Sequence, residues 1–148
     1  PPIRSAEDRA ALVEGIKDGT IDMIATDHAP HSIEEKSRGL KDSAMGIVGL
    51  ETAFAALNTH LVKKGIITLE HLVKIMSENP RKVFRIEGGI EVGERADVVL
   101  LDVNKEWRVD SEKFYSMGKI TMFDGRDMVG DVVMTLHRGN VVYDNKNK

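Results

Sequence analysis

Cysteine is absent from the sequence, which excludes a disulfide framework, a cysteine-based zinc site and a thiol nucleophile. A chain without cysteine suits a reducing compartment, so we expect a cytoplasmic protein. Aromatic residues make up only 5% of the chain and no basic stripe accompanies them, so nothing points to nucleic acid as a partner. No apolar run approaches the roughly 18 residues of a membrane helix, and no membrane partner is expected.

An initiator methionine is also missing, because the chain begins Pro-Pro-Ile-Arg, and this start is not a signal peptide. We therefore expect an excised or processed piece of a longer chain. Its 148 residues, 41% of them hydrophobic and 30% charged, fit a globular protein of one or two small domains. The net charge of −3 is distributed over interspersed acids and bases.

The most informative stretch lies where an apolar run, Ile21–Ala25, ends abruptly in an acid and two histidines. The run has the length and composition of a buried strand, and Pro30 stops strand pairing because it lacks an N–H. Asp27 is therefore expected where a strand opens into a loop, the end at which catalytic groups gather in α/β barrels. A carboxylate there can bind a metal or move a proton, and His28 and His31 add imidazoles nearby.

Helical patterns surround this expected strand. A first helix is expected between a capping Ser5 and the turn at Asp18-Gly19. Its apolar face consists of Leu12, Val13 and Ile16. This order of elements, a helix, a tight turn, a buried strand and another helix, is typical of a parallel α/β fold. The polar segment 32–43 is interpreted as a loop, for which a solvated surface loop is the ordinary explanation. Its length and its position just after Asp27 favour a loop that borders or covers a site.

A second helix is expected to begin within the segment Met45–Glu51 and to end at Gly65. The two glycines of this segment allow a close backbone approach, for which helix packing is the ordinary explanation. The apolar residues that follow at helical spacing are assigned to the core: Leu50, Phe54, Leu57 and Leu61.

Two more helical segments follow. Thr68 is expected to cap a third helix that buries Leu72 and Ile75. Asn79-Pro80 then begins a short helical turn, with Asn79 as its cap and the proline at its first helical position. The apolar side of that turn is Val83 and Phe84.

From Gly88-Gly89 onward the pattern changes to strands. Apolar runs cover residues 97–102, 131–137 and 141–143, with a two-residue hairpin turn expected at Gly139-Asn140. Trp107 stands among charged residues and is interpreted as a partly buried anchor, and His137 as a structural histidine. We therefore expect a small β module that carries no catalytic cluster.

Among five histidines, only His28 and His31 are close enough in the sequence to suggest a metal pair. Pro30 makes their segment non-helical, so the spacing does not place both imidazoles on one face. Catalytic zinc normally needs about three protein ligands. With Asp27 alone, a closed metal site inside this chain is not expected.

The segment Asp27-His28-Ala29-Pro30-His31 resembles the last barrel strand of dihydroorotases, as do Pro1–Arg4 and Asp18–Asp22 before it. Gly46–Glu51 is similar to the segment after that strand. Asn79-Pro80 and Gly93–Asp97 are similar to the helix end and the small β domain of the wider cyclic amidohydrolases. Asp-His-Ala-Pro is shared with dihydropyrimidinases and allantoinases, whereas the final histidine and the upstream Pro-Pro-x-Arg favour dihydroorotase.

This resemblance implies an α/β fold. Residues 1–87 would be the last βα units of a metal-dependent (β/α)8 barrel, and residues 88–148 part of a small β-sandwich domain. It implies a zinc-dependent cyclic amidohydrolase that interconverts dihydroorotate and N-carbamoyl-aspartate in pyrimidine biosynthesis. One or two zinc ions are implied, with every ligand except Asp27 outside this chain. Besides the small-molecule substrate, the expected partner is the missing N-terminal barrel portion; a homo-oligomer is left open, and the chain alone is expected to be inactive.

The resemblance also implies roles for individual residues. Asp27 would bind zinc and act as general base on the bridging hydroxide, and would then donate that proton to the leaving amide nitrogen. His31 would hold the substrate carboxylate. The backbone around Met45 and Gly46 would meet the polar groups of the pyrimidine ring, while His28 would serve loop structure.

Two classes of function stay open at this point. The first is a hydrolase piece in which Asp27 is catalytic, and the second is a non-catalytic fragment or assembly module that keeps the fold. Within the first class, a dihydropyrimidinase, hydantoinase or allantoinase-like activity is the alternative to dihydroorotase.

Overall fold

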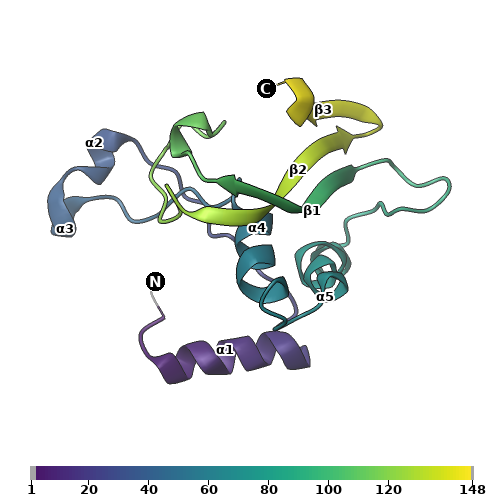
Figure 1. The fold of residues 1–148 in the computed structure, drawn as a ribbon, viewed down its shortest axis with the longest axis horizontal. Coiled ribbons are helices and arrows are strands. Elements are labelled where there is room, and N and C mark those ends of the chain that lie inside the picture. The colour runs from purple at the N-terminus through teal and green to yellow at the C-terminus, as the bar shows by residue number, and fades with distance from the viewer. Residues whose placement is uncertain (1–2, 148) are drawn as a thin grey trace.

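Helices dominate the first part of the chain and strands the second in the computed structural model, which describes residues 3–147 (Figure 1). Pro1 and Pro2, two residues of the upstream motif, lie outside the described residues. The helical elements are α1 Ala6–Asp18, α2 Ile33–Lys36, α3 Gly39–Asp42, α4 Ala53–Leu57, η1 Asn58–Val62, α5 Leu69–Val73, η2 Lys74–Glu78, α6 Asn79–Phe84, η3 Ser111–Lys113 and η4 Asn145–Asn147. The strands are β1 Val98–Arg108, β2 Asp127–His137 and β3 Asn140–Asp144. No helix within residues 3–147 is both long enough and apolar enough to span a membrane.

The first helix, α1, has the predicted ends. Ser5 Oγ accepts a hydrogen bond from Asp8 N at 3.0 Å, and Gly19 takes a left-handed conformation with φ 83° after the last turn. Its predicted apolar face is only partly used, because Ile16 packs against the core whereas Leu12 is 42% exposed.

The predicted strand Ile21–Ala25 is wrong as a regular element. The segment has no strand ladder, and the pairing found beside it is a single parallel bridge between His28 and Ile47, with Ala29 N donating to Ile47 O at 3.0 Å. A strand needs a neighbour to accept and donate along its length. Within residues 3–147 no neighbouring strand does so. The segment is held instead by single hydrogen bonds to the helices, such as Ile24 N to Ile75 O at 3.3 Å, and by the packing of Ile24 against the core.

The second helix begins later than predicted. Residues 45–49 have no helical structure, and α4 starts at Ala53 before continuing through the π-helical η1. Gly46 has φ 127°, which no helix allows. Leu50 consequently lies before the helix and is 62% exposed, so its assignment to the core is wrong, whereas Phe54, Leu57 and Leu61 do pack there.

The elements α5, η2 and α6 follow one another without a break. Thr68 caps α5 by accepting from His71 N at 3.1 Å, and Leu72 and Ile75 are fully buried, as predicted. Asn79 is not the predicted N-cap, because its backbone is already helical and α6 begins with it; its Nδ2 instead donates to Asp22 O at 2.7 Å. The expected apolar side of the last turn, Val83 and Phe84, is 56% and 67% exposed.

The strands form one antiparallel three-stranded sheet in the order β1-β2-β3. The two-residue hairpin is real but lies one residue earlier than predicted, at Arg138-Gly139, where both residues have positive φ (50° and 78°). Trp107 is partly buried as expected and its Nε1 donates to Gly130 O at 2.8 Å. A second sheet, and hence a β-sandwich, is not present within residues 3–147.

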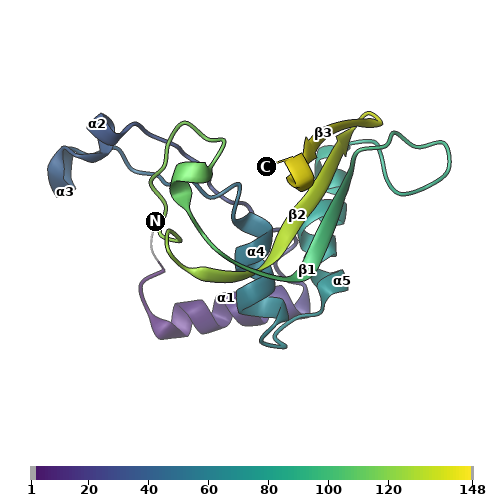
Figure 2. The ribbon, with the colours of Figure 1, turned by 45° about the horizontal axis from the view of Figure 1, so that its top comes forward.

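Two hydrophobic clusters hold the chain together. One lies beneath the sheet and combines residues from both halves of the sequence: Val48, Ala55, Val109, Phe114 and Met128. The other joins the helices: Leu61, Ile67, Leu72 and Ile75. Figure 2 shows α4, the helix that follows the Asp27–His31 segment, against the sheet, where it contacts β2. The predicted boundary between residues 87 and 88 therefore separates parts that share a core.

Candidate active site

Asp27 occupies an unusual backbone conformation at the end of the extended segment. Its φ is 48°, in the left-handed region that few non-glycine residues adopt, although aspartate and asparagine do so more readily than most. The residue is exposed. Within residues 3–147 no group hydrogen bonds to its carboxylate, which is therefore available to a ligand. Strained residues of this kind gather at functional sites.

His28 fastens the loop to the segment that follows it. Its Nδ1 accepts hydrogen bonds from Gly49 N and Leu50 N, both at 3.2 Å. A ring nitrogen that accepts carries no proton. His28 therefore serves loop structure through Nδ1, which is not open to a metal while these bonds persist.

His31 contacts one of the residues expected to join it in substrate binding. Its Nε2 lies 2.9 Å from Met45 O, and because a carbonyl can only accept, Nε2 carries the proton and donates. Its Nδ1 lies 3.7 Å from Glu35 Oε2, beyond hydrogen-bond distance. His31 is 28% exposed, so the imidazole is held at its edges yet remains accessible.

Gly46 completes the predicted trio. A Cβ on Gly46 would lie 2.6 Å from Ala29 Cβ, 2.7 Å from Ala29 O and 3.4 Å from His31 Cδ2, so only glycine fits between the two segments. The structure therefore brings His31, Met45 and Gly46 together. Gly118 packs against the same loop from another side, since a Cβ added to Gly118 would lie 2.8 Å from Pro30 Cβ and 3.1 Å from His31 N. The sequence holds no local signal that marks Gly118.

The polar loop is more ordered than its composition predicts. In place of an irregular segment, α2 and α3 lie at the tip of an excursion away from the sheet (Figures 1 and 2). Ser32 and Glu35 form a capping box at the start of α2. The hydrogen bonds from the backbone N–H and hydroxyl of Ser32 lower the pKa of the Glu35 carboxyl, and His31 contributes a smaller attraction in the same direction.

Lys36 ties the two stems of this excursion together. Its Nζ donates to Ala44 O at 2.9 Å and to Gly46 O at 2.8 Å, and it is partly buried. The carbonyls that it binds flank Met45, whose own carbonyl is taken by His31. Neither Glu35 nor Lys36 is marked by the sequence analysis, because a charged run in a loop is ordinarily a solvated face.

The described residues offer one ligand to a metal rather than a whole site. Within residues 3–147 no three histidine or carboxylate groups lie close enough to hold an ion. His28 and His31 each commit one ring nitrogen to backbone groups. Asp27, exposed and without a hydrogen-bond partner in the described part of the chain, has the donor chemistry of a single zinc ligand.

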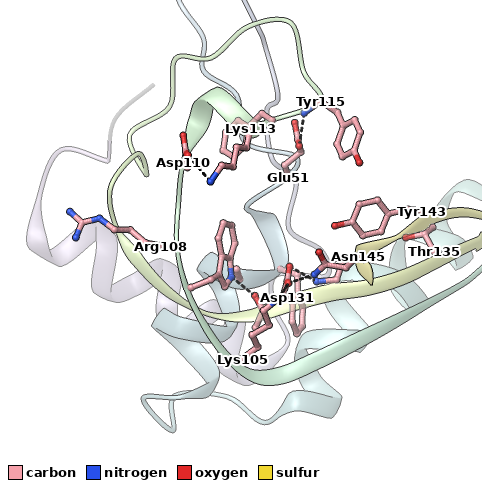
Figure 3. A pocket seen from close by; sticks show the side chains of 16 residues that line it. Glu51, Lys105, Arg108, Asp110, Lys113, Tyr115, Asp131, Thr135, Tyr143 and Asn145 are labelled. Carbon is pink, nitrogen blue, oxygen red and sulfur yellow. Dashed lines mark hydrogen bonds and ion pairs between the residues drawn. The ribbon is translucent and has the colours of Figure 1, made fainter. Parts of the chain in front are cut away.

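A cavity of about 410 Å³ lies apart from these residues, beside the sheet (Figure 3). Its polar groups satisfy one another: Lys105 Nζ lies 2.6 Å from Asp131 Oδ2, to which Asn145 Nδ2 also donates at 2.6 Å. Glu51 accepts from Tyr115 N at 2.9 Å. None of the predicted site residues lines this cavity, so the candidate site is the loop around Asp27 and not the cavity.

Comparison with known proteins identifies the relatives of this chain. The profile of the Amidohydrolase family matches residues 3–142. Dihydroorotase from Anoxybacillus flavithermus is 51% identical over 144 residues, which are 97% of this chain and 34% of that protein. The chain thus spans about a third of the length of the curated relatives it matches.

Solved structures agree with this family. L-Hydantoinase (dihydropyrimidinase) from Arthrobacter aurescens is 40% identical with a TM-score of 0.88, over 97% of this chain and 33% of that one. Dihydropyrimidinase from Brevibacillus agri is 30% identical with a TM-score of 0.89, over 99% of this chain and 33% of that one. The α/β architecture with a small sheet therefore corresponds to part of such a fold, and the chain belongs to the amidohydrolase family.

Proposed function

We propose that these residues form the C-terminal part of a dihydroorotase, which interconverts dihydroorotate and N-carbamoyl-aspartate by reversible hydrolysis of a cyclic amide in pyrimidine biosynthesis. The observation that carries this proposal is the 51% identity to a dihydroorotase over nearly the whole chain. The contact among His31, Met45 and Gly46 supports it, because these residues are the ones expected to bind the substrate.

Asp27 is proposed as both the proton carrier and a zinc ligand. Its carboxylate is exposed and unpartnered among the described residues, and so can accept a proton from the attacking water and return it to the leaving amide nitrogen. Bound zinc would supply Lewis acidity, polarising the amide carbonyl and lowering the pKa of water. The remaining ligands of one or two such ions belong to residues outside this chain.

His31 is proposed to bind the substrate carboxylate through Nδ1, because Nε2 already donates to Met45 O. Nδ1 can donate in addition only when the imidazole is protonated, which makes the hydrogen bond charge-assisted. The polar groups of the substrate's pyrimidine ring would be met by the backbone N–H groups of Met45 and Gly46. Within residues 3–147 neither N–H has an acceptor, whereas the neighbouring carbonyls are occupied.

The finer architecture is part of the proposal. Residues 1–87 would close a (β/α)8 barrel with the missing N-terminal portion, and the three-stranded sheet would belong to a small β-sandwich completed outside this chain. A cytoplasmic location and a homo-oligomeric assembly accompany this proposal.

A hydantoinase or dihydropyrimidinase is the second candidate function. The observation in its favour is the L-hydantoinase structure, which is 40% identical and has a TM-score of 0.88. Both candidates use the same Asp27 chemistry on a cyclic amide. They differ in the substrate carboxylate, which dihydroorotate carries and dihydrouracil lacks.

The deciding experiment assays the complete gene product that contains these residues against dihydroorotate, dihydrouracil, hydantoin and allantoin. We expect a value of kcat/KM at least about 100-fold higher for dihydroorotate, since the site is built to pair with its carboxylate. A preference for hydantoin or dihydrouracil would replace the proposal by the second candidate. No turnover of any of the four compounds by the zinc-loaded protein would support the non-catalytic alternative.

A further inference from the structure

The short helix α2 adds a further connection between the two backbone segments that the Ala29–Ile47 and His31–Met45 hydrogen bonds already join. It follows His31 directly, and its last residue, Lys36, reaches across to the returning segment 44–46. Glu35, beside it, does not compete for the ammonium group, because its carboxylate accepts from Ser32 N at 2.9 Å and Ser32 Oγ at 3.0 Å. No salt bridge to Lys36 is formed within residues 3–147.

We propose that Lys36 is a positioning residue that aims the backbone N–H of Met45 at the substrate. This inference rests on the proposed function, in which Met45 and Gly46 meet the substrate ring. Lys36 itself touches no substrate; it acts through the peptide groups that it holds.

The argument begins with the planarity of the peptide bond. The Ala44 carbonyl and the Met45 N–H belong to one rigid plane and point in opposite directions, since no cis peptide bond occurs here. Fixing Ala44 O with the Lys36 ammonium therefore fixes the direction of the Met45 N–H. In the same way His31 Nε2, by holding Met45 O, fixes the direction of the Gly46 N–H.

The second bond of Lys36 completes the arrangement. By holding Gly46 O at 2.8 Å it fixes the next peptide plane, so three consecutive planes are fixed by two side chains. Hydrogen bonds from a charged donor are about twice as strong as neutral ones, and Lys36 is partly shielded from water. Without this side chain, the peptide between Ala44 and Met45 would lose its own hydrogen bond and be held only through its neighbours, by Ala44 N donating to Glu35 O at 2.9 Å and by His31 at Met45 O. The Met45 side chain adds no packing, because it is 89% exposed.

The test compares three variants in the complete gene product. Lys36→Met keeps the length of the side chain but removes the donors. Lys41→Met is the matched control, because Lys41 lies on α3 in the same loop, is exposed, and has no hydrogen bond to any residue from 3 to 147. Lys36→Arg keeps a charged donor and is expected to restore part of the loss.

We expect Lys36→Met to raise KM for the preferred substrate about tenfold or more, while kcat changes less than about twofold and bound zinc is unchanged. Lys41→Met should leave both constants at the wild-type values. A purely structural role would lower kcat through a loss of active enzyme and leave KM unchanged. An unchanged KM, or an equal rise in both variants, would overturn the proposal.

A second measurement is independent of the substrate. Amide hydrogen exchange at Ala44, whose N–H donates to Glu35 O at 2.9 Å, and at Ala29, whose N–H donates to Ile47 O at 3.0 Å, should be faster in Lys36→Met than in Lys41→Met, and equal rates would overturn the proposal. If the wild-type protein prefers hydantoin, the proposed function is wrong. The role of Lys36 is then tested by comparing KM for hydantoin among the variants. If it turns over none of the four cyclic amides, the exchange rates alone decide whether Lys36 orders this backbone.

Discussion

Asp27 combines an exposed carboxylate with a left-handed backbone, and asparagine is the substitution that keeps both the shape and the tolerance for positive φ. We expect Asp27→Asn in the complete gene product to lower kcat by about 1,000-fold or more, because the amide has neither the basicity to carry a proton nor the charge to bind a metal. Steady-state kinetics and circular dichroism would measure activity and fold together.

Asp22→Asn is the control for this variant, because Asp22 is exposed, lies five positions earlier and engages only its backbone carbonyl. It should retain wild-type turnover. Near-normal turnover in Asp27→Asn would show that another group carries the proton.

At His31 the expected effect is on binding. His31→Ala removes the proposed partner of the substrate carboxylate and the bond to Met45 O, so KM should rise about 10- to 100-fold, which corresponds to a charge-assisted bond of about 1.5–3 kcal/mol. Zinc content, measured by atomic absorption, should stay at the wild-type value. His60→Ala, at an exposed helical position, is the control. Loss of zinc with an unchanged KM would make His31 a metal ligand instead.

Among the elements, the contact between the Asp27–His31 loop and the segment 44–49 depends on Gly46. Gly46→Ala should lower the local opening free energy of both segments by about 2–5 kcal/mol, because it adds backbone strain to a clash with Ala29. Gly39→Ala separates the two causes, since Gly39 has φ 80° but no atom lies within 4 Å of the place that an added methyl group would take. Amide exchange should show a smaller loss there. Equal losses would mean that strain, and not the close approach, determines the effect.

The β2–β3 hairpin is held to the preceding loop by Asp97. Its Oδ1 accepts from Arg138 N at 2.7 Å and lies 3.0 Å from His137 Nδ1, and its Oδ2 lies 2.6 Å from Arg95 Nε. The Arg138 N–H, with Arg95 and His137 in support, holds the pKa of the Asp97 carboxyl below its ordinary value of 3.8. A carboxyl with a lowered pKa in the folded state stabilises that state above the unfolded pKa and loses this effect as the pH falls.

We therefore expect Asp97→Asn to speed amide exchange in β3 relative to wild type at pH 6, with the difference shrinking as the pH falls below about 3.8. Comparison at each pH cancels the intrinsic dependence of exchange on pH. Asp127→Asn, at the far end of β2, should show no such difference. A difference that stays constant down to pH 2 would exclude the Asp97 carboxylate as its source.

Local signals predicted the elements that depend on local chemistry. Ser5 and Thr68 cap their helices as expected because a cap needs only the next three residues. The strand before Asp27 was not formed, because a strand depends on neighbours that are distant in the sequence. The helix after Gly46 was placed too early, because the apolar stripe does not reveal a backbone with φ 127°.

The candidate site was likewise predicted only in part from the sequence. Its motif, Asp27 to His31, was recognisable from a short run of residues, and the approach of Met45 and Gly46 followed from the resemblance to dihydroorotases. Lys36 and Gly118 were not predictable, since their importance lies in contacts with residues that are 8 to 88 positions away. The metal and substrate roles of these residues remain predictions.

For the whole molecule, we expect residues 1–148 expressed alone to lack dihydroorotase activity and to bind zinc weakly. Asp27 supplies one ligand where a catalytic zinc needs about three. Exposed apolar side chains, such as Leu50 at 62% and Phe84 at 67%, should promote self-association. Dialysis against zinc, metal analysis and light scattering would test this. A monomer with one tightly bound zinc and measurable turnover would contradict it.

The contacts of Gly118 with Pro30 and His31, and of Ile120 O with Val48 N at 2.8 Å, impose an order of events on synthesis. The loop that carries the proposed catalytic groups leaves the ribosome well before the residues that close it. About 70 residues separate Gly46 from Gly118, and at roughly 5–20 residues per second their translation takes about 4–14 seconds. For that interval the Asp27–His31 loop has its contacts with residues 45–50 but lacks those of Gly118, so the full set of contacts around the proposed site forms only late in synthesis.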